Sequence, residues 1–281
     1  MRRLRWLLAL LGALLAVALL AGGTAVYFAV TRQPAPWSDS CTASASGDAV
    51  RLEPAQARNA AIIAGVGLRR GLGEPAVTIA LATAWQESGL RNLPHGDRDS
   101  IGLFQQRPSQ GWGTEAQIMD PYYAAGAFYV AMVKVDGWRT ADVGDVAQAV
   151  QRSGYPDAYD KWVAKARVLA AGFTGASGAT FTCAERTRSA ADAAGLASYL
   201  GKTLPAADRV TRSGQATLTI DTPDAAAARS AAALTLAHGS AYGVLALSAD
   251  GKAWRASWPL SPEWRAADQA GPAGRVVVTL G

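Results

Sequence analysis

The sequence has few of the residue types on which metal and thiol chemistry depend. Its 281 residues include only two histidines and two cysteines, and His95 and His238 lack the spacing of metal ligands. A zinc site is therefore not expected. No Gly-x-Ser-x-Gly motif occurs, so nothing indicates the nucleophile turn of a serine hydrolase. We predict that the protein uses no metal and no cofactor.

An excess of positive charge is also missing from most of the chain. There are 27 Lys and Arg against 22 Asp and Glu, but Arg2, Arg3, Arg5 and Arg32 all flank one N-terminal apolar segment. The remainder is nearly neutral and has no basic stripe. Nucleic acid is therefore not an expected partner.

No charged residue occurs from Trp6 to Val30. This segment exceeds the roughly 20 residues that a membrane-spanning helix needs. The arginines before it predict a cytoplasmic N-terminus and an extracytoplasmic bulk. A cleaved signal peptide is the alternative, although its apolar region usually has only about 7–15 residues. We expect a single-pass protein of the cell membrane, held there through residues 6–30.

The two cysteines, Cys41 and Cys183, enclose most of the first half of the exported part. Export permits a stable disulfide, and we predict that the two are bonded. A loop of this length would stabilise the fold by about 4–5 kcal/mol in the chain-entropy model. Two unpaired buried thiols are the alternative.

Cap and proline signals divide the chain into segments. We predict helices over 54–70, 75–87, 120–135, 142–153 and 156–171, with an ordered loop or small ribbon over 92–113. A loop that long is usually functional. Beyond a small-residue linker at 173–182, we predict helices over 189–204 and 221–237 and strands over 215–221, 243–248, 252–256 and 275–280. An Asp250-Gly251 hairpin signal joins the two middle strands.

One glutamate has the surroundings of a general acid. In the segment Ala84-Trp85-Gln86-Glu87-Ser88-Gly89-Leu90, the carboxylate follows an apolar helix stripe. The helix C-terminus disfavours negative charge, and Trp85 and Phe104 would add desolvation. Both effects raise a carboxyl pKa, as protonation of a glycosidic oxygen near neutral pH requires.

A second motif follows within twenty residues, Ser100-Ile101-Gly102-Leu103-Phe104-Gln105-Gln106. Together the two motifs resemble the SLT-type lytic transglycosylases, which usually have Met where Phe104 stands. The resemblance covers roughly residues 54–172. It implies a lysozyme-like domain that cleaves the MurNAc–GlcNAc bond of peptidoglycan. Glu87 would be the only acid/base, and a 1,6-anhydro ring would close without a second carboxylate.

Further residues are candidates for substrate binding. Ser88 and Ser100 match family serines that place the glutamate and the N-acetyl group. Gly102 would let the backbone approach the sugar, Gln105 and Gln106 offer amides, and Trp112 offers a stacking ring. Asp97 and Asp99 are the candidates for a second carboxylate. They leave a muramidase-type hydrolysis open.

The sequence departs from the family at one motif. The usual Ala-Tyr-Asn-x-Gly is best matched by Ala149 to Gly154, where Gln151 or Arg152 replaces Tyr and Asn, and Tyr155 follows out of register. An alternative is therefore a catalytically weak glycan-binding scaffold of a membrane complex. In that case the C-terminal domain would hold a protein partner.

The expected fold is a mainly α lysozyme-like domain after one transmembrane helix, followed by a small α+β domain that resembles a partial ferredoxin-like sandwich. The expected segments are a cytoplasmic tip and anchor, a linker, the lysozyme-like domain, a second linker and the accessory domain, at 1–32, 33–52, 53–173, 174–187 and 188–281.

Overall fold

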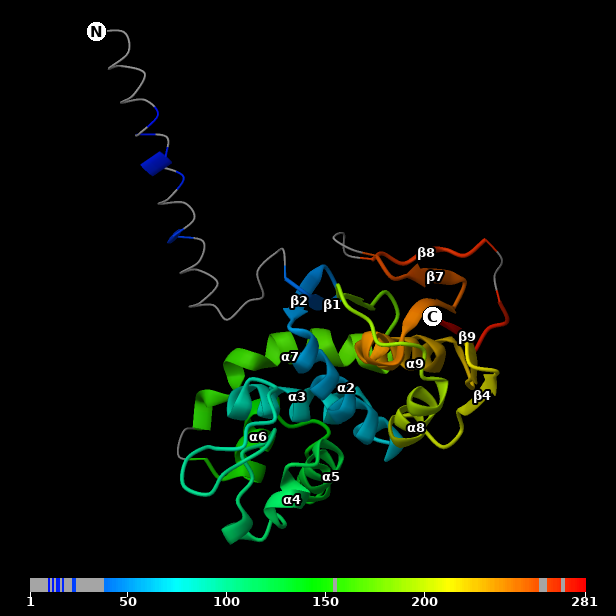
Figure 1. The fold of residues 1–281 in the computed structure, drawn as a ribbon. Coiled ribbons are helices and arrows are strands. Elements are labelled where there is room, and N and C mark those ends of the chain that lie inside the picture. Colours follow the sequence, from blue (N-terminus) through cyan, green and yellow to red (C-terminus); the bar gives the residue numbers. More distant parts are fainter. Residues whose placement is uncertain are drawn as a thin grey trace, which may run out of the picture. The chain divides into compact units, whose positions relative to one another are not determined.

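A computed structural model describes residues 38–153, 156–257, 262–268 and 271–281, with single positions 10, 12, 14, 15, 17, 22 and 23. The chain forms two units, Met1–Ser38 and Asp39–Gly281. The seven single positions of the first unit are helical. The site and the sheets belong to the second unit, which is drawn from blue to red in Figure 1.

Six helices make up a helical lobe, and their starts follow the capping signals. Proline occupies the first turn of several of them, and Thr114 and Asp120 cap two N-termini through their side chains. The helices are α2 (Pro54–Arg69), α3 (Glu74–Ser88), α4 (Glu115–Ile118), α5 (Pro121–Met132), α6 (Val143–Gln151) and α7 (Asp160–Thr174). The predicted helices of this region are confirmed apart from their exact ends, and α4 was not foreseen.

A small sheet occupies segments that we expected to be linkers. Strands β1 (Ser40–Ala45), β2 (Asp48–Leu52) and β3 (Thr180–Ala184) pair antiparallel in the order β2-β1-β3. Cys41 and Ala43, two positions apart on β1, both face the core. The other residues of this strand are Ser, Thr and Ala, so its buried and exposed positions differ little in hydrophobicity. The expectation of unstructured linkers over these residues is therefore wrong.

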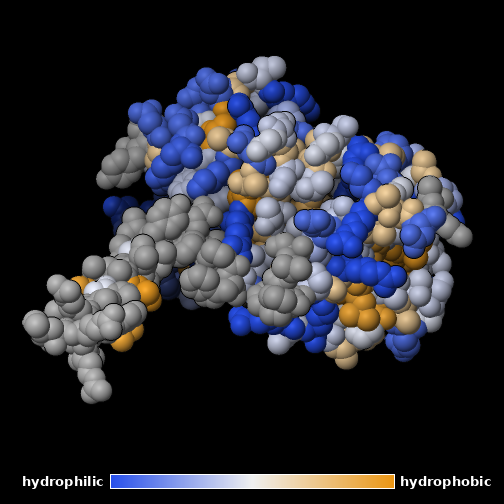
Figure 2. Space-filling model, turned by 90° about the horizontal axis from the view of Figure 1, so that it is seen from above, coloured by the Kyte–Doolittle hydropathy of each residue, from blue (hydrophilic) through white to orange (hydrophobic). Residues whose placement is uncertain are grey.

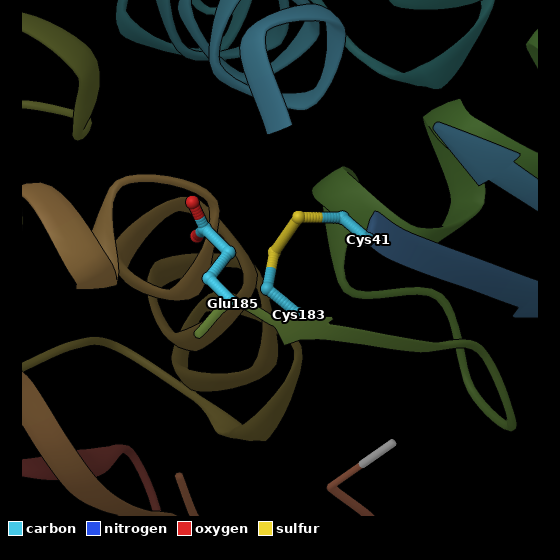
Figure 3. A group of neighbouring side chains, drawn as sticks. All are labelled: Cys41, Cys183 and Glu185. Atoms are coloured by element: carbon cyan, nitrogen blue, oxygen red, sulfur yellow. A yellow bond between two sulfur atoms is a disulfide. The ribbon is translucent and has the colours of Figure 1, made fainter. Parts of the chain in front are cut away.

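The predicted disulfide is confirmed. Cys41 and Cys183 face each other across the β1–β3 pair, and their sulfur atoms are bonded. Figure 3 shows the bond with Glu185 beside it. Because the two sulfurs are bonded to each other, they offer no thiolate to a metal ion, although a Glu185 oxygen lies within 4.8 Å of them.

The C-terminal part forms a larger antiparallel sheet with the order β4-β5-β9-β6-β7-β8. Helices α8 (Ala193–Thr203) and α9 (Ala225–Ala237) lie between this sheet and the helical lobe, so α9 contacts both α7 and the central strands. Figure 1 shows α9 in this position. The strands are β4 (Arg209–Ser213), β5 (Thr217–Asp221), β6 (Val244–Ala249), β7 (Lys252–Arg255), β8 (Arg265–Ala266) and β9 (Arg275–Leu280).

The fold class expected from the sequence is wrong. The described residues contain eight helices and nine strands in two antiparallel sheets, so sheet structure also flanks the helices that carry the motifs. β1 and β2 precede these helices and β3 follows them. The unit Asp39–Gly281 is thus an α+β structure, not a mainly α domain with a small α+β appendage.

The expectation of a single-pass membrane protein is contradicted as well. Among the described residues, no helix has both the length and the apolar character needed to cross a membrane. Most of the apolar stretch 6–30, on which that expectation depended, lies outside the described residues.

Small residues let the helical lobe and the C-terminal helices pack closely. A Cβ added at Gly65 of α2 would lie 2.5 Å from the Cβ of Thr203 on α8. Hydrogen bonds cross the same boundary: Ser230 Oγ donates to the Phe173 carbonyl at 2.6 Å, and Arg69 donates to the Leu204 carbonyl at 3.0 Å. The two parts therefore share a packed boundary within one compact unit. Their division into domains at 173–188 stays a prediction.

Candidate active site

Glu87 occupies the last turn of α3. The helix ends at Ser88, and Gly89 caps it in the left-handed conformation, with φ of 63°. The Glu87 side chain is only partly exposed. A carboxylate at this end of a helix lies beside unpaired carbonyl groups, which disfavour its charged form. The predicted position of Glu87 at a helix end is confirmed.

A buried tyrosine contacts the Glu87 carboxylate. The Tyr159 hydroxyl donates a hydrogen bond to Glu87 Oε1 at 2.7 Å, and the tyrosine side chain is fully buried just before α7. Burial raises the pKa of Tyr159, and the charge of Glu87 raises it further. Tyr159 therefore stays a neutral donor near neutral pH.

Gln151 is the second polar neighbour of Glu87. It ends α6, and its Nε2 donates to the Phe104 carbonyl at 2.7 Å. Its side chain also hydrogen-bonds to Glu87 and lowers the pKa of that carboxyl. Gln151 thus links the glutamate to the loop that carries the second motif.

Burial decides the protonation of Glu87. Desolvation raises its pKa, and this exceeds the lowering by the hydrogen bonds from Tyr159 and Gln151. Both partners are neutral, so neither supplies a positive charge that would hold the carboxylate ionised. A half-buried carboxyl with a raised pKa can donate a proton and take one back.

Side-chain contacts hold helix α7 against α3 next to this site. Trp85 stacks on Trp162 with ring centroids 5.3 Å apart, and Trp162 Nε1 donates to Gln86 Oε1 at 2.8 Å. Because Tyr159 immediately precedes α7, these contacts fix the distance between the Tyr159 hydroxyl and Glu87.

The second motif lies in a loop with two isolated antiparallel bridges, Leu93 to Gly102 and Ile101 to Gln106. The prediction of an ordered loop or small ribbon is therefore confirmed as an ordered loop with isolated bridges. Ser88 Oγ donates to the Leu103 carbonyl at 2.7 Å, so the loop is attached to the end of α3. Phe104 is fully buried against Phe128, with centroids 4.5 Å apart.

Most of the motif side chains bind the loop itself. Ser100 Oγ donates to the Asp97 carbonyl, and Gln105 Nε2 reaches the His95 carbonyl at 3.3 Å. Gln106 is buried and donates to the Ala124 carbonyl at 3.2 Å. Gly102 has φ of 81°, and a Cβ there would lie 2.9 Å from the Ile118 carbonyl oxygen. These contacts build the loop, while the predicted contacts with sugar stay predictions.

The two candidate second carboxylates differ from Glu87. Asp99 accepts hydrogen bonds from Arg107 Nε at 2.7 Å and from the Ser109 amide at 2.9 Å. Hydrogen bonds from Ser109, followed by that from Arg107, hold the pKa of Asp99 well below its usual range. Asp97 is almost fully exposed and lies 3.9 Å from Arg98. Both aspartates are thus engaged by arginines of their own loop.

A cleft of about 670 Å³ opens beside the site. Its walls come from the loop, α5 and α6, and they include Gln110, Trp112, Lys134, Gln151 and Arg152. Trp112 is partly exposed there. Glu87 is not among the residues that line this cleft, but Gln151 lines it and also hydrogen-bonds to Glu87. Gln151 therefore links the cleft to the carboxyl group.

The sequence reasoning missed Tyr159. It considered Tyr155 as the replacement for the family tyrosine, and Tyr155 lies outside the described residues. The segment 156–158 forms a short 3-10 turn before α7 begins at Asp160. The only sequence signal was a tyrosine one position before this helix.

Comparison with known proteins adds no family: no protein-family model matches the chain, and no curated protein matches it either.

Proposed function

We propose that the protein is a peptidoglycan-cleaving lytic transglycosylase and that Glu87 is its acid/base. The observation that carries the proposal is the Glu87 carboxyl, half-buried and held by two neutral donors, Tyr159 and Gln151. The resemblance of the two motifs to the SLT-type enzymes supports the choice of substrate. Tyr159 also supplies a tyrosine hydroxyl at the glutamate, although the usual tyrosine motif is missing.

The reaction requires a proton to move twice. Protonated Glu87 gives its proton to the glycosidic oxygen as the bond from that oxygen to C1 of the MurNAc ring breaks. The resulting carboxylate then takes the proton of the same sugar's 6-hydroxyl as O6 bonds to C1. The products are a 1,6-anhydro sugar end and a free 4-hydroxyl, with Glu87 protonated again. The raised pKa of Glu87 suits both steps.

The contacts of Asp99 favour this route over hydrolysis. Hydrolysis with two carboxylates needs a second group free to activate water or to attack the sugar. Both oxygens of Asp99 are occupied within its loop. We therefore assign no catalytic role to Asp99.

The test is product analysis by mass spectrometry after incubating the full chain with purified peptidoglycan. We expect anhydro-muropeptides from the wild type and none from Glu87→Gln. The matched control is Glu74→Gln, which changes an exposed glutamate at the other end of the same helix and should leave activity intact. Products with reducing ends would mean hydrolysis. Binding without any cleavage would instead support the glycan-binding scaffold.

A further inference from the structure

The cleft beside Glu87 continues into a second hollow. The first, here called the Gln151 hollow, and a second of about 490 Å³, here called the Tyr123 hollow, share Trp112, Ala131 and Lys134. The Tyr123 hollow lies against α5 and reaches Arg70 at the end of α2. The two hollows therefore adjoin at Trp112, Ala131 and Lys134, and together they are called the groove below.

The two hollows differ in hydrogen-bonding chemistry. The Gln151 hollow has two side-chain amides. Gln110 can both donate to and accept from sugar hydroxyls, whereas Gln151 donates to the Phe104 carbonyl and to Glu87 and offers its amide oxygen as an acceptor. Among the described residues that line the Tyr123 hollow, none has an amide or carboxylate side chain. Its charged groups are Arg70 and Lys134, which are donors only, and the Tyr123 hydroxyl donates to the Trp112 carbonyl.

The cations of the groove have no acidic partners. Arg70, Lys134 and Arg152 form no ion pair within the described part of the chain, and no acidic residue is among the described lining of either hollow. Arg70 extends over α5, because its Nη2 lies 2.9 Å from where a Cβ of Gly126 would be. A concave surface with charges of one sign attracts ligands of the opposite sign.

The Tyr123 hollow also has an apolar side. Tyr123 and Val130 of α5 and Val133, which caps its end, are three of the four large hydrophobic side chains exposed by the described part of Asp39–Gly281. The first two line the hollow. Seen from above, another face of this unit is largely hydrophilic with scattered hydrophobic patches (Figure 2). Small apolar surfaces beside cations suit short peptides with methyl side chains and free carboxylates.

We propose that the Tyr123 hollow binds the carboxylate-bearing peptide branch of the wall polymer, while sugar rings occupy the Gln151 hollow. Arg70 and Lys134 bind the carboxylates, and Tyr123 and Val130 contact the methyl groups. This assignment rests on the proposed function, because it takes the glycan strand to lie beside Glu87. It makes Arg70 and Lys134 determinants of specificity for peptide-bearing strands over bare glycan.

The test measures binding to the full chain carrying Glu87→Gln, so that no probe is cleaved. The probes are fluorescent peptidoglycan oligomers with intact peptides, the same oligomers stripped of peptides by an amidase, and the free acidic peptide. We expect the intact oligomers to bind about tenfold more tightly than the stripped ones. Arg70→Gln and Lys134→Gln should each weaken binding of the intact oligomers about three- to fivefold. Arg70→Gln, which changes a residue of the Tyr123 hollow alone, should leave binding of the stripped oligomers unaffected. Arg212→Gln on strand β4 is the matched control.

The outcomes separate this inference from the proposed function. Equal affinity for intact and stripped oligomers would overturn the peptide assignment and leave the enzyme proposal standing. Binding of the free peptide that depends on Lys134, without any affinity for stripped glycan, would support the assignment and count against the enzyme proposal. No binding of any probe would overturn both.

Discussion

Glu87 and Asp99 belong to the same helical lobe but have opposite surroundings. Glu87 is half-buried, and this burial raises its pKa more than the hydrogen bonds from the neutral Tyr159 and Gln151 lower it. Asp99 lies in an exposed turn, and its hydrogen bonds from Ser109 and the Arg107 guanidinium lower its pKa. Burial at Glu87 and hydrogen bonds at an exposed turn for Asp99, and not the carboxyl group itself, decide which acid can exchange a proton near neutral pH.

Of the changes proposed here, removing the Tyr159 hydroxyl should have the largest effect on the difference between Glu87 and Asp99. We expect Tyr159→Phe to lower kcat by about 10- to 100-fold, because a hydrogen bond to a charged group is lost at the reacting carboxyl. Since that bond lowers the pKa of Glu87, its loss should move the basic limb of the pH–rate profile to higher pH.

The measurement is kcat over a range of pH with soluble peptidoglycan fragments. Tyr123→Phe removes a hydroxyl that binds the Trp112 carbonyl and serves as the control, whose basic limb should stay in place. An unchanged profile in Tyr159→Phe would mean that the contact with Glu87 does not tune its proton affinity.

Burial also shifts the pKa of a basic group in the C-terminal part. The His238 ring packs against Tyr199 at a tilt of 34°, with ring centroids 4.0 Å apart, and its Nδ1 has no partner among the described residues. Burial, followed by the charge of Arg58, lowers the pKa of His238 to about 3. The unfolded chain binds this proton below about pH 6.5, so folding stability should fall as the pH drops from about 6.5 toward 3.

We expect His238 to account for roughly 2 kcal/mol of lost stability at pH 5. His238→Phe keeps a ring against Tyr199 and cannot take up a proton, so its stability should depend less on pH. Urea unfolding of both proteins between pH 7 and pH 5 measures the difference. A His95→Phe variant, altered at an exposed histidine, should behave like the wild type. Parallel pH curves for wild type and His238→Phe would refute the assignment.

How much of the fold could be predicted depends on how clearly each segment separates hydrophobic from polar positions. Prolines and caps located the starts of α2, α3 and α5 to within a residue. Strands β1 and β3 were not predicted, because most of their residues are small or polar. They are strands because they pair with each other and pack against α7. Long-range pairing of this kind leaves little trace in the local sequence.

Only part of the candidate site could be predicted from the sequence. The end of α3 is a local feature, so the position of Glu87 could be read from the sequence. Tyr159 reaches Glu87 only because α7 is clamped to α3 through Trp85 and Trp162. The register of the family motif led to Gln151 and Arg152 and gave no tyrosine, because the tyrosine that contacts Glu87 comes from a later position, Tyr159.

Substitution of Asp99 should have the smallest effect on activity, and a small effect would itself be informative. If Asp99 only holds its turn through Arg107 and Ser109, then Asp99→Asn should change kcat by less than about threefold, as is usual for exposed ion pairs. The pH–rate profile should keep both limbs, and the products should still carry anhydro ends. Kinetics and product masses on the same peptidoglycan fragments check this, with Asp97→Asn as the neighbouring control. A loss comparable to that of Glu87→Gln would show that Asp99 takes part in the chemistry, and the mechanism would then need a second carboxylate.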